Sequence, residues 1–264
     1  MIGASSENFA VLASIETPSR VSSWLRRNVS SNVLEKDDYW RYVGGLRSNA
    51  MSIHASADEV NPLVERIVNG LEAVIELEVA NSGYVPASPR DAAQVLFGVT
   101  RGQVGTLTDS NARSLADNVQ LIFKGQRREP TVVVRDRGIG IHPSEFDTTI
   151  LAIGQSDKGD RPYLIGMYGH GGSSTFDKCE YTVILSRRRP SLLTPSQKDQ
   201  VGWTVVRRQI GGRLFRYRYL VDPATGKVPF GDGSDGSSID LAHGTLVAHI
   251  GYKGLGGCGA RDHQ

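Results

Sequence analysis

The stretch TVVVRDRGIGIHPSE, residues 131–145, contains a strand that ends in an unusual way. Its three successive valines predict a buried strand. The strand runs into Asp136, which is followed by Gly138 and Gly140, and a proline then precedes a predicted short helix over 143–152. The question is what requires a carboxylate and a backbone with almost no side chains at this edge of a sheet.

The composition is that of an ordinary globular protein. The 264 residues are 39 % hydrophobic and 22 % charged, which is enough for one large domain or two small ones. Lys and Arg number 30 against 28 Asp and Glu, so bulk charge gives no reason to expect nucleic-acid binding. Two cysteines fit a reducing compartment without a structural disulfide or zinc site. No signal peptide and no membrane span is recognisable, so we expect a cytoplasmic protein.

Helical patterns come early in the chain and strand patterns come late. The strongest helix is predicted over 56–80, and the apolar residues that follow one helical face are Leu63, Ile67, Leu71, Val74 and Ile75. Other helices are predicted over 33–49, 88–99 and 108–125, and strands over 179–188, 202–210, 213–221 and 244–252. This segregation favours an α+β layered fold.

The N-terminal residues 1–35 are polar, Ser-rich and weakly periodic. They predict an arm that precedes a single domain over 36–264. The segment GDGSDG at 231–236 matches a dinucleotide fingerprint only formally, because a proline-containing loop precedes it and the polar segment SSIDLAHG follows it, where the fingerprint requires a strand and a helix. The six histidines have no metal-ligand spacing.

Two other stretches could contribute to a site with Asp136. Glu65 and Asn69 are four residues apart in the predicted helix, so they share one face. In residues 162–176, PYLIGMYGHGGSSTF, glycines crowd a loop that leads toward a helix N-terminus, where successive N–H groups can hold an anion. Taken alone, a solvated helix face explains the first stretch equally well, and a flexible surface loop explains the second stretch better than a binding site does.

The patterns E-x-x-x-N-x-x-[DE]-A, D-x-G-x-G and G-x-x-G-x-G, with G-T before a late strand, occur in this order over roughly residues 60–250. Together they resemble the GHKL ATPase superfamily, nearest to its heat-shock-chaperone and MutL-type ATP-binding domains. The resemblance implies the Bergerat fold, a two-layer α/β sandwich with a mixed, mostly antiparallel sheet and helices on one face. It also implies a mobile ATP lid at about 142–172. A predicted helical insert at about 82–128 departs from the family, which often runs more directly from the helix to the strand.

The resemblance assigns roles to individual residues. Asp136 would accept a hydrogen bond from the adenine amino group, since a carboxylate acceptor rejects a guanine carbonyl. Asn69 would coordinate Mg²⁺, an ion that also takes phosphate and water oxygens. Glu65 would be the catalytic residue that orients and polarises the attacking water. The remaining nucleotide-binding residues that the resemblance implies are Glu72, Ala73, Gly138, Gly140, Ile141, Lys158, Gly166, Gly169, His170, Gly171, Gly172 and Thr245.

Three of these residues need comment. Glu72 stands where the family usually has Asp, so its contact differs by one methylene. Lys158 is a plausible contact to the γ-phosphate, and a solvated loop lysine is an equally good interpretation. Thr245 would support Asp136 and a bound water.

The carboxylate of Glu65 favours hydrolysis of ATP, because a histidine kinase needs no activated water. We therefore expect a Mg²⁺-dependent ATPase module at the N-terminus of a larger protein, with a downstream effector domain or partner. ATP-driven homodimerisation, assisted by the arm, or lid closure would drive a conformational change. The alternatives are a histidine-kinase-like catalytic domain and a regulatory module that binds nucleotide without turnover. The sequence does not separate chaperone, DNA-repair and phage-defence roles.

Overall fold

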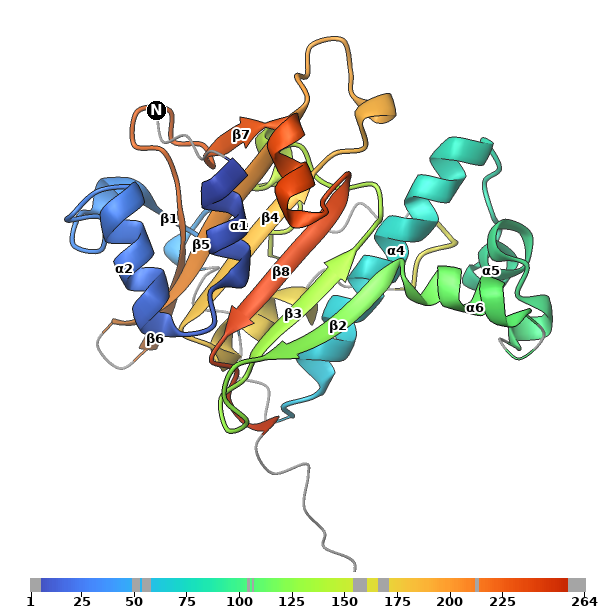
Figure 1. The fold of residues 1–264 in the computed structure, drawn as a ribbon, viewed down its shortest axis with the longest axis horizontal. Coiled ribbons are helices and arrows are strands. Elements are labelled where there is room, and N and C mark those ends of the chain that lie inside the picture. Colours follow the sequence, from blue (N-terminus) through green and yellow to red (C-terminus); the bar gives the residue numbers. More distant parts are fainter. Residues whose placement is uncertain are drawn as a thin grey trace, which may run out of the picture.

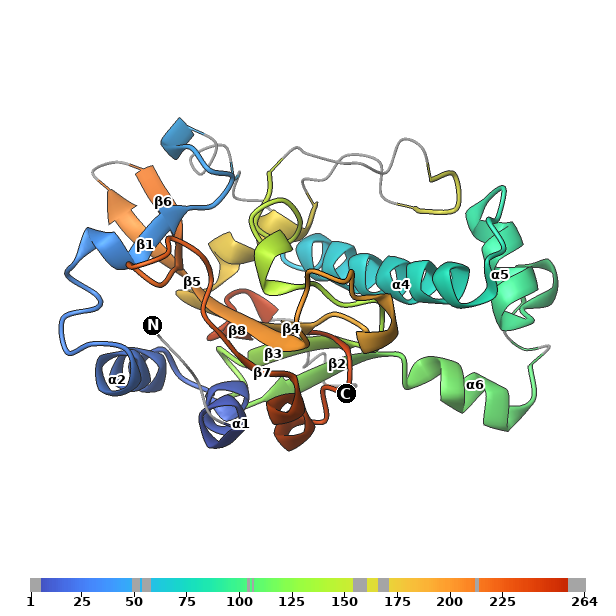
Figure 2. The same ribbon diagram turned by 90° about the horizontal axis from the view of Figure 1, so that it is seen from above.

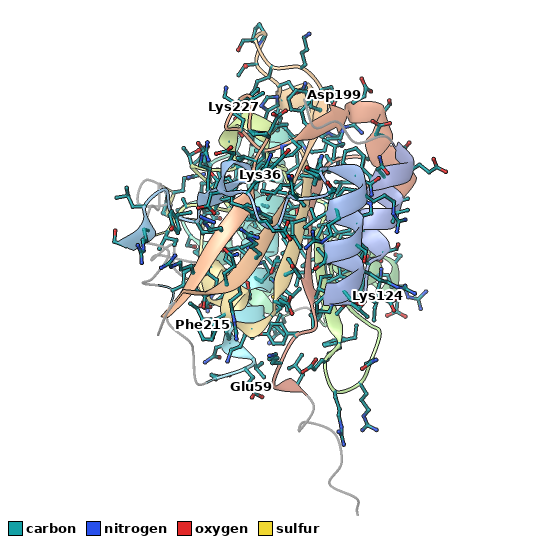
Figure 3. The ribbon with its side chains drawn as sticks, turned by 90° about the vertical axis from the view of Figure 1, so that its left-hand side faces the viewer. Lys36, Glu59, Lys124, Asp199, Phe215 and Lys227 are labelled. Carbon is teal, nitrogen blue, oxygen red and sulfur yellow. The ribbon has the colours of Figure 1, made fainter. Side chains whose placement is uncertain are left out.

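The computed structural model, drawn in Figure 1, describes residues 6–48, 53, 58–103, 105, 107–153, 161–165, 171–211 and 214–255. It is a mixed α/β fold built on one open sheet. Helices cover both faces of this sheet, with α4 on one side and α1 and α2 on the other (Figure 2). Charged side chains such as Lys36 and Lys227 point outward from the body (Figure 3).

The described strands pair in the order β1-β6-β5-β4-β8-β3-β2, and β7 pairs with β5. Their bounds are Trp40–Tyr42 (β1), Val119–Lys124 (β2), Thr131–Asp136 (β3), Tyr181–Arg187 (β4), Gln200–Gly211 (β5), Leu214–Leu220 (β6), Phe230–Asp232 (β7) and Gly244–Ile250 (β8). Every pairing between these described strands is antiparallel, which confirms the prediction of a mostly antiparallel sheet, and no parallel pair occurs among them.

The described α-helices are Ser6–Ser14 (α1), Pro18–Asn28 (α2), Asn61–Ser82 (α4), Pro89–Phe97 (α5) and Asp109–Ala116 (α6). Short 3₁₀ helices span Asp37–Tyr39 (η1), Thr100–Gly102 (η2), Pro143–Glu145 (η4), Gly171–Lys178 (η6), Pro190–Leu192 (η7) and Gly233–Ile239 (η8). Two α-helices start alike, because the side chains of Thr17 and Ser88 accept a backbone N–H and a proline follows each of them. Among the described helices, none has the length and apolar character needed to cross a membrane.

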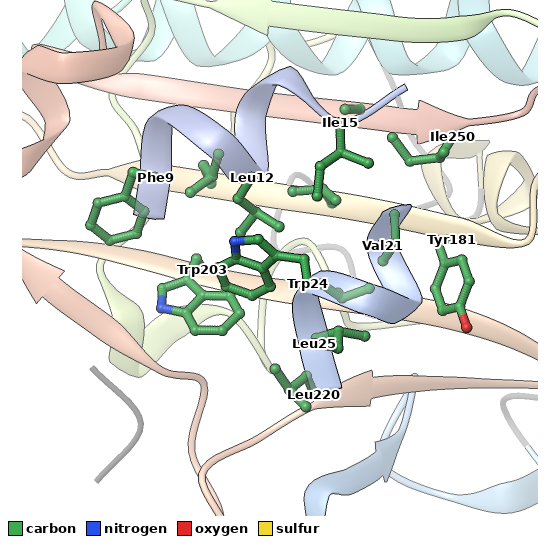
Figure 4. Packing of buried hydrophobic residues seen from close by; sticks show 14 of the residues in the cluster. Phe9, Leu12, Ile15, Val21, Trp24, Leu25, Tyr181, Trp203, Leu220 and Ile250 are labelled. Atoms are coloured by element: carbon green, nitrogen blue, oxygen red, sulfur yellow. The ribbon is translucent and has the colours of Figure 1, made fainter. Parts of the chain in front are cut away.

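The two N-terminal helices belong to the core. Their side chains with no exposed surface are Phe9, Leu12, Val21 and Leu25. Trp24 packs edge-on against Trp203 of β5, with ring centroids 5.3 Å apart (Figure 4). The prediction of a separate arm over 1–35 is therefore wrong for the described residues. These few large apolar side chains follow helical spacing over two short segments only, and the surrounding serines made that pattern hard to recognise.

The sheet needs a helical layer on each face, because its central strands turn apolar side chains both ways. Val183 and Leu185 of β4 face α1 and α2. Ile184, which lies between them, packs with Phe146 and Phe176 on the opposite face. Successive residues of a strand point to opposite faces, so an unbroken apolar run requires cover on both. The prediction of helices on one face only is wrong for this reason.

Two predicted helices are partly strands. The segment predicted as helix over 33–49 contains η1 and β1. The helix predicted over 108–125 ends at Ala116, and β2 follows it, pairing with β3 from Val119 opposite Asp136 to Lys124 opposite Thr131. The hydrogen-bonding edge of β3 outweighs the weak helical preference of VQLIFK. The predicted insert over 82–128 thus consists of helices α5 and α6 and ends in a strand of the main sheet.

The face of helix α4 that packs against the sheet differs from the apolar face that the sequence predicted. Leu63 and Val74 are buried as predicted, but Leu71 is 42 % exposed. Gly70 occupies the sheet-facing side instead, and a Cβ there would lie 3.3 Å from the Cβ of Asp136. The small residue allows α4 to approach the end of β3 closely.

Candidate functional site

A row of three polar side chains crosses the sheet where β3, β8 and β4 meet. Asp136 and Ser186 each lie opposite Thr245 in strand register, so all three point to the same face. This is the face that α4 covers, since Gly70 sits over Asp136. The exposed fractions of the three residues are 7 %, 0 % and 5 % for Asp136, Ser186 and Thr245. Polar side chains buried this deeply require hydrogen-bond partners.

The carboxylate of Asp136 uses its two oxygens differently. Oδ1 accepts the backbone N–H of Gly138 at 2.9 Å and that of Thr245 at 3.2 Å. Within the described part of the chain, no hydrogen bond to Oδ2 is found. One oxygen therefore fixes the side chain, and the other remains available to accept a bond from a ligand.

Burial raises the pKa of Asp136 to about 7. The N–H groups of Gly138 and Thr245, together with the charges of Arg135 and Arg66, act in the opposite direction but do not compensate for the loss of water. The side chain accepts through both oxygens only when it is ionised. Its capacity to bind a donor therefore changes close to neutral pH.

The two glycines after Asp136 are required by close backbone contacts. A Cβ on Gly138 would lie 2.5 Å from the backbone of Ala73 in α4, and the N–H of Ile139 donates to the Ala73 carbonyl at 2.9 Å. Gly140 has a φ of +69°, and a Cβ there would collide with the carbonyl oxygen of Arg187. These contacts hold the loop that follows β3 in place between Ala73 of α4 and Arg187 of β4.

The polar face of α4 carries the other predicted residues of this helix. Glu65 is exposed, and Asn69, one turn later, is half-buried. Glu72 is buried, with 3 % of its surface exposed, and its carboxylate accepts the N–H of Ile165 at 2.8 Å. Glu72 therefore holds the chain just before the glycine-rich loop, and its predicted contact with nucleotide stays a prediction.

A buried arginine on α4 was missed by the sequence interpretation. Arg66 donates to Oγ1 of Thr175 at 3.1 Å and lies 5.6 Å from the ring centroid of Phe176. Burial lowers its pKa to about 10, so it stays charged at neutral pH. The contact joins α4 to η6, the helix that begins with the predicted residues Gly171 and Gly172. An arginine within an apolar helical face was the available sequence signal.

Ser186 and His243 were also missed. The Ser186 hydroxyl accepts the N–H of Ile141, donates to the Gly244 carbonyl and contacts Thr245 Oγ1, each at 2.9 Å. Nδ1 of His243 lies 2.8 Å from the Gly138 carbonyl oxygen. A serine at the end of the apolar run YTVILS was the sequence signal for Ser186.

The predicted lid over 142–172 is only partly described. Phe146 and Leu151 have no exposed surface and belong to the core beside β5 and β6, so the start of the predicted lid is packed structure. Ile141 is half-buried at the edge of this cluster. The predicted site residues that lie outside the described residues are Lys158, Gly166, Gly169 and His170.

No group of three or more His, Cys, Asp or Glu side chains that could hold a metal ion occurs within the described ranges. A bound Mg²⁺ that is coordinated mainly by phosphates and water needs only one or two oxygens from the protein. The amide oxygen of the half-buried Asn69 is a suitable donor of this kind. The residues present therefore fit the predicted use of Mg²⁺ together with a phosphate ligand.

Comparison of the sequence with protein-family models and with curated proteins gave no match.

Proposed function

We propose that this chain is a GHKL-type ATP-binding domain with a Bergerat fold that hydrolyses ATP in the presence of Mg²⁺. The observation that carries the proposal is the carboxylate of Asp136, buried at the end of β3 with Oδ1 held by two backbone N–H groups. Its second oxygen suits an exocyclic amino group. A carbonyl at the same position would meet only lone pairs, which favours adenine over guanine.

The phosphate end of the site would lie along the polar face of α4. Asn69 would hold Mg²⁺, which would neutralise charge on the phosphates when bound. Glu65, one turn before Asn69 and exposed, would orient a water molecule for attack on the γ-phosphate. The backbone at Gly171 and Gly172, where η6 begins, would add N–H donors to phosphate.

The presence of Glu65 supports hydrolysis over the histidine-kinase and binding-module alternatives, because neither of these requires a group that activates water. Packing of α1 and α2 into the core removes the support for a dimer formed by an exchanged arm. Closure of a lid on ATP, coupled to an effector domain or partner, remains the proposed way in which hydrolysis produces movement.

Replacement of Asp136 by Asn tests the adenine contact directly. Asn keeps an oxygen for the N–H groups of Gly138 and Thr245 but places an NH₂ donor where Oδ2 was. We expect affinity for ATP to fall by about 1.5–3 kcal/mol, the value of a charge-assisted hydrogen bond. Calorimetric titration with the β,γ-imido analogue of ATP measures this loss of affinity. Equal affinity of the two proteins would show that Asp136 does not bind adenine.

The affinity for ATP should also depend on pH through Asp136. The carboxylate is protonated below its pKa of about 7 and ionised above it. Affinity should therefore rise as the pH is raised from 6 to 8 and then level off. Titration of the β,γ-imido analogue across this range measures the slope of affinity against pH. The Asp136→Asn variant serves as the control, because any dependence that it retains comes from the phosphates of the ligand; identical slopes would exclude Asp136 as the source.

A further inference from the structure

We propose that Ser186, which is fully buried beneath the site, sets the preference for adenine by holding the hydroxyl proton of Thr245. The inference rests on the proposed nucleotide site and adds a positioning residue to it. Ser186 is the residue before the last in β4, lies opposite Thr245 in register and has no exposed surface. It therefore acts on a ligand only through its neighbours.

Counting protons determines which hydroxyl donates. The Ser186 oxygen lies 2.9 Å from the Gly244 carbonyl oxygen and 2.9 Å from Thr245 Oγ1. Each of these contacts between two oxygens needs one proton. Ser186 has only one, and a carbonyl has none. Ser186 therefore donates to Gly244, and Thr245 supplies the proton of the second contact.

The third contact fills the last hydrogen-bonding position of the Ser186 hydroxyl. A hydroxyl oxygen donates once and accepts twice. The N–H of Ile141, at 2.9 Å, takes one acceptor position, and the hydroxyl of Thr245 takes the other. Ser186 thus fixes the rotation of the Thr245 hydroxyl and turns its proton away from any ligand.

The result is a wall of the proposed site whose side chains only accept hydrogen bonds. Thr245 Oγ1 keeps lone pairs alone, and ionised Asp136, its register partner on the same face, offers lone pairs as well. An amino group provides the donor that this wall requires. A carbonyl oxygen in the same place would face lone pairs without a proton, which is costly in a buried site.

Removal of the Ser186 hydroxyl should relax this selection. In Ser186→Ala, the proton of Thr245 is free to rotate and to donate to a carbonyl oxygen of the base. Inosine triphosphate carries such a carbonyl in place of the adenine amino group. We therefore expect the ratio of affinities, ATP over inosine triphosphate, to fall by about tenfold or more, within the range typical of buried polar discrimination.

The experiment measures both affinities by calorimetry, with the β,γ-imido analogues of ATP and inosine triphosphate. Thr182→Ala is the matched control, since Thr182 is a buried hydroxyl on the same strand that bonds Cys179 and His249 away from the site. It should destabilise the protein without changing the ratio. In a Thr245→Val background, Ser186→Ala should also have no effect on the ratio, because the hydroxyl through which it acts is absent.

The outcomes separate this inference from the proposed function. A parent protein that prefers the adenine analogue, with the same preference in Ser186→Ala, overturns the role of Ser186 alone. A loss of preference that persists in the Thr245→Val background also overturns it, because the effect would not pass through Thr245. A parent that binds neither analogue overturns the proposed function and this inference with it.

Discussion

Substitution of Glu65 by Ala is expected to slow ATP turnover by about 10²–10⁴-fold, the usual contribution of a group that positions or deprotonates the attacking water. Binding of ATP should survive, because Glu65 is exposed on α4 and contacts water rather than nucleotide in the proposed site. Asn69→Ala should weaken both binding and turnover, since it removes the proposed Mg²⁺ ligand. Steady-state phosphate release, measured over a range of protein concentrations, gives the rates.

The matched control is Glu78→Ala, which removes a carboxylate from another face of the same helix. It should leave turnover at the parental rate. If Glu65→Ala also turns over at the parental rate, hydrolysis does not depend on this residue, and the kinase or binding-module alternative moves ahead. Transfer of the γ-phosphate to a protein histidine would identify the kinase.

Deletion of residues 1–28 is expected to unfold the domain. The deletion removes α1 and α2, whose fully buried side chains include Phe9, Leu12 and Leu25. Each such side chain contributes roughly 1.5–3 kcal/mol through burial. Several of them together approach the whole stability of a typical domain, about 5–15 kcal/mol. Circular dichroism and thermal denaturation of the truncated protein measure the loss.

Two neighbouring residues of α1 provide a finer test. Leu12 has no exposed surface, and Val11 is 46 % exposed. Leu12→Ala should cost about 2–5 kcal/mol of unfolding free energy, and Val11→Ala should change it by no more than about 0.5 kcal/mol. A cooperative, parental melting transition in the truncated protein would contradict the packing of these helices into the core.

The sequence predicted those elements whose residues repeat regularly. α4 was predicted within a few residues of its bounds, and β3 was recognised from three consecutive valines. β2 was mistaken for helix because its pairing with β3 is a long-range contact that local preference does not contain. The second helical layer was also missed, although the unbroken apolar run in β4 required cover on both faces.

The sequence indicated those parts of the candidate site in which a residue is unusual for its position, such as a carboxylate or a glycine at the end of a buried strand. Asp136 and its glycines fall in this class, and the structure places them at a buried strand end. Ser186 was missed because serine is common and its importance comes from cross-strand neighbours. Arg66 was missed because an arginine within an apolar helical face is only a weak signal, and the burial of its side chain becomes evident in the assembled core.

The burial of Asp136 has opposite effects on the proposed nucleotide binding and on the stability of the fold. Its pKa in the folded protein, about 7, lies above the ordinary 3.8, so the fold favours the protonated side chain. Unfolding free energy of the empty protein is therefore lost as the pH rises from about 4 to about 7, and the loss is complete above that. An uncharged residue at this position would relieve the penalty and weaken the proposed adenine contact. Directed evolution for heat resistance alone would thus tend to replace Asp136 and so weaken the proposed binding site. In that proposal, a bound nucleotide would donate a hydrogen bond to the carboxylate and offset part of the free energy lost by its burial.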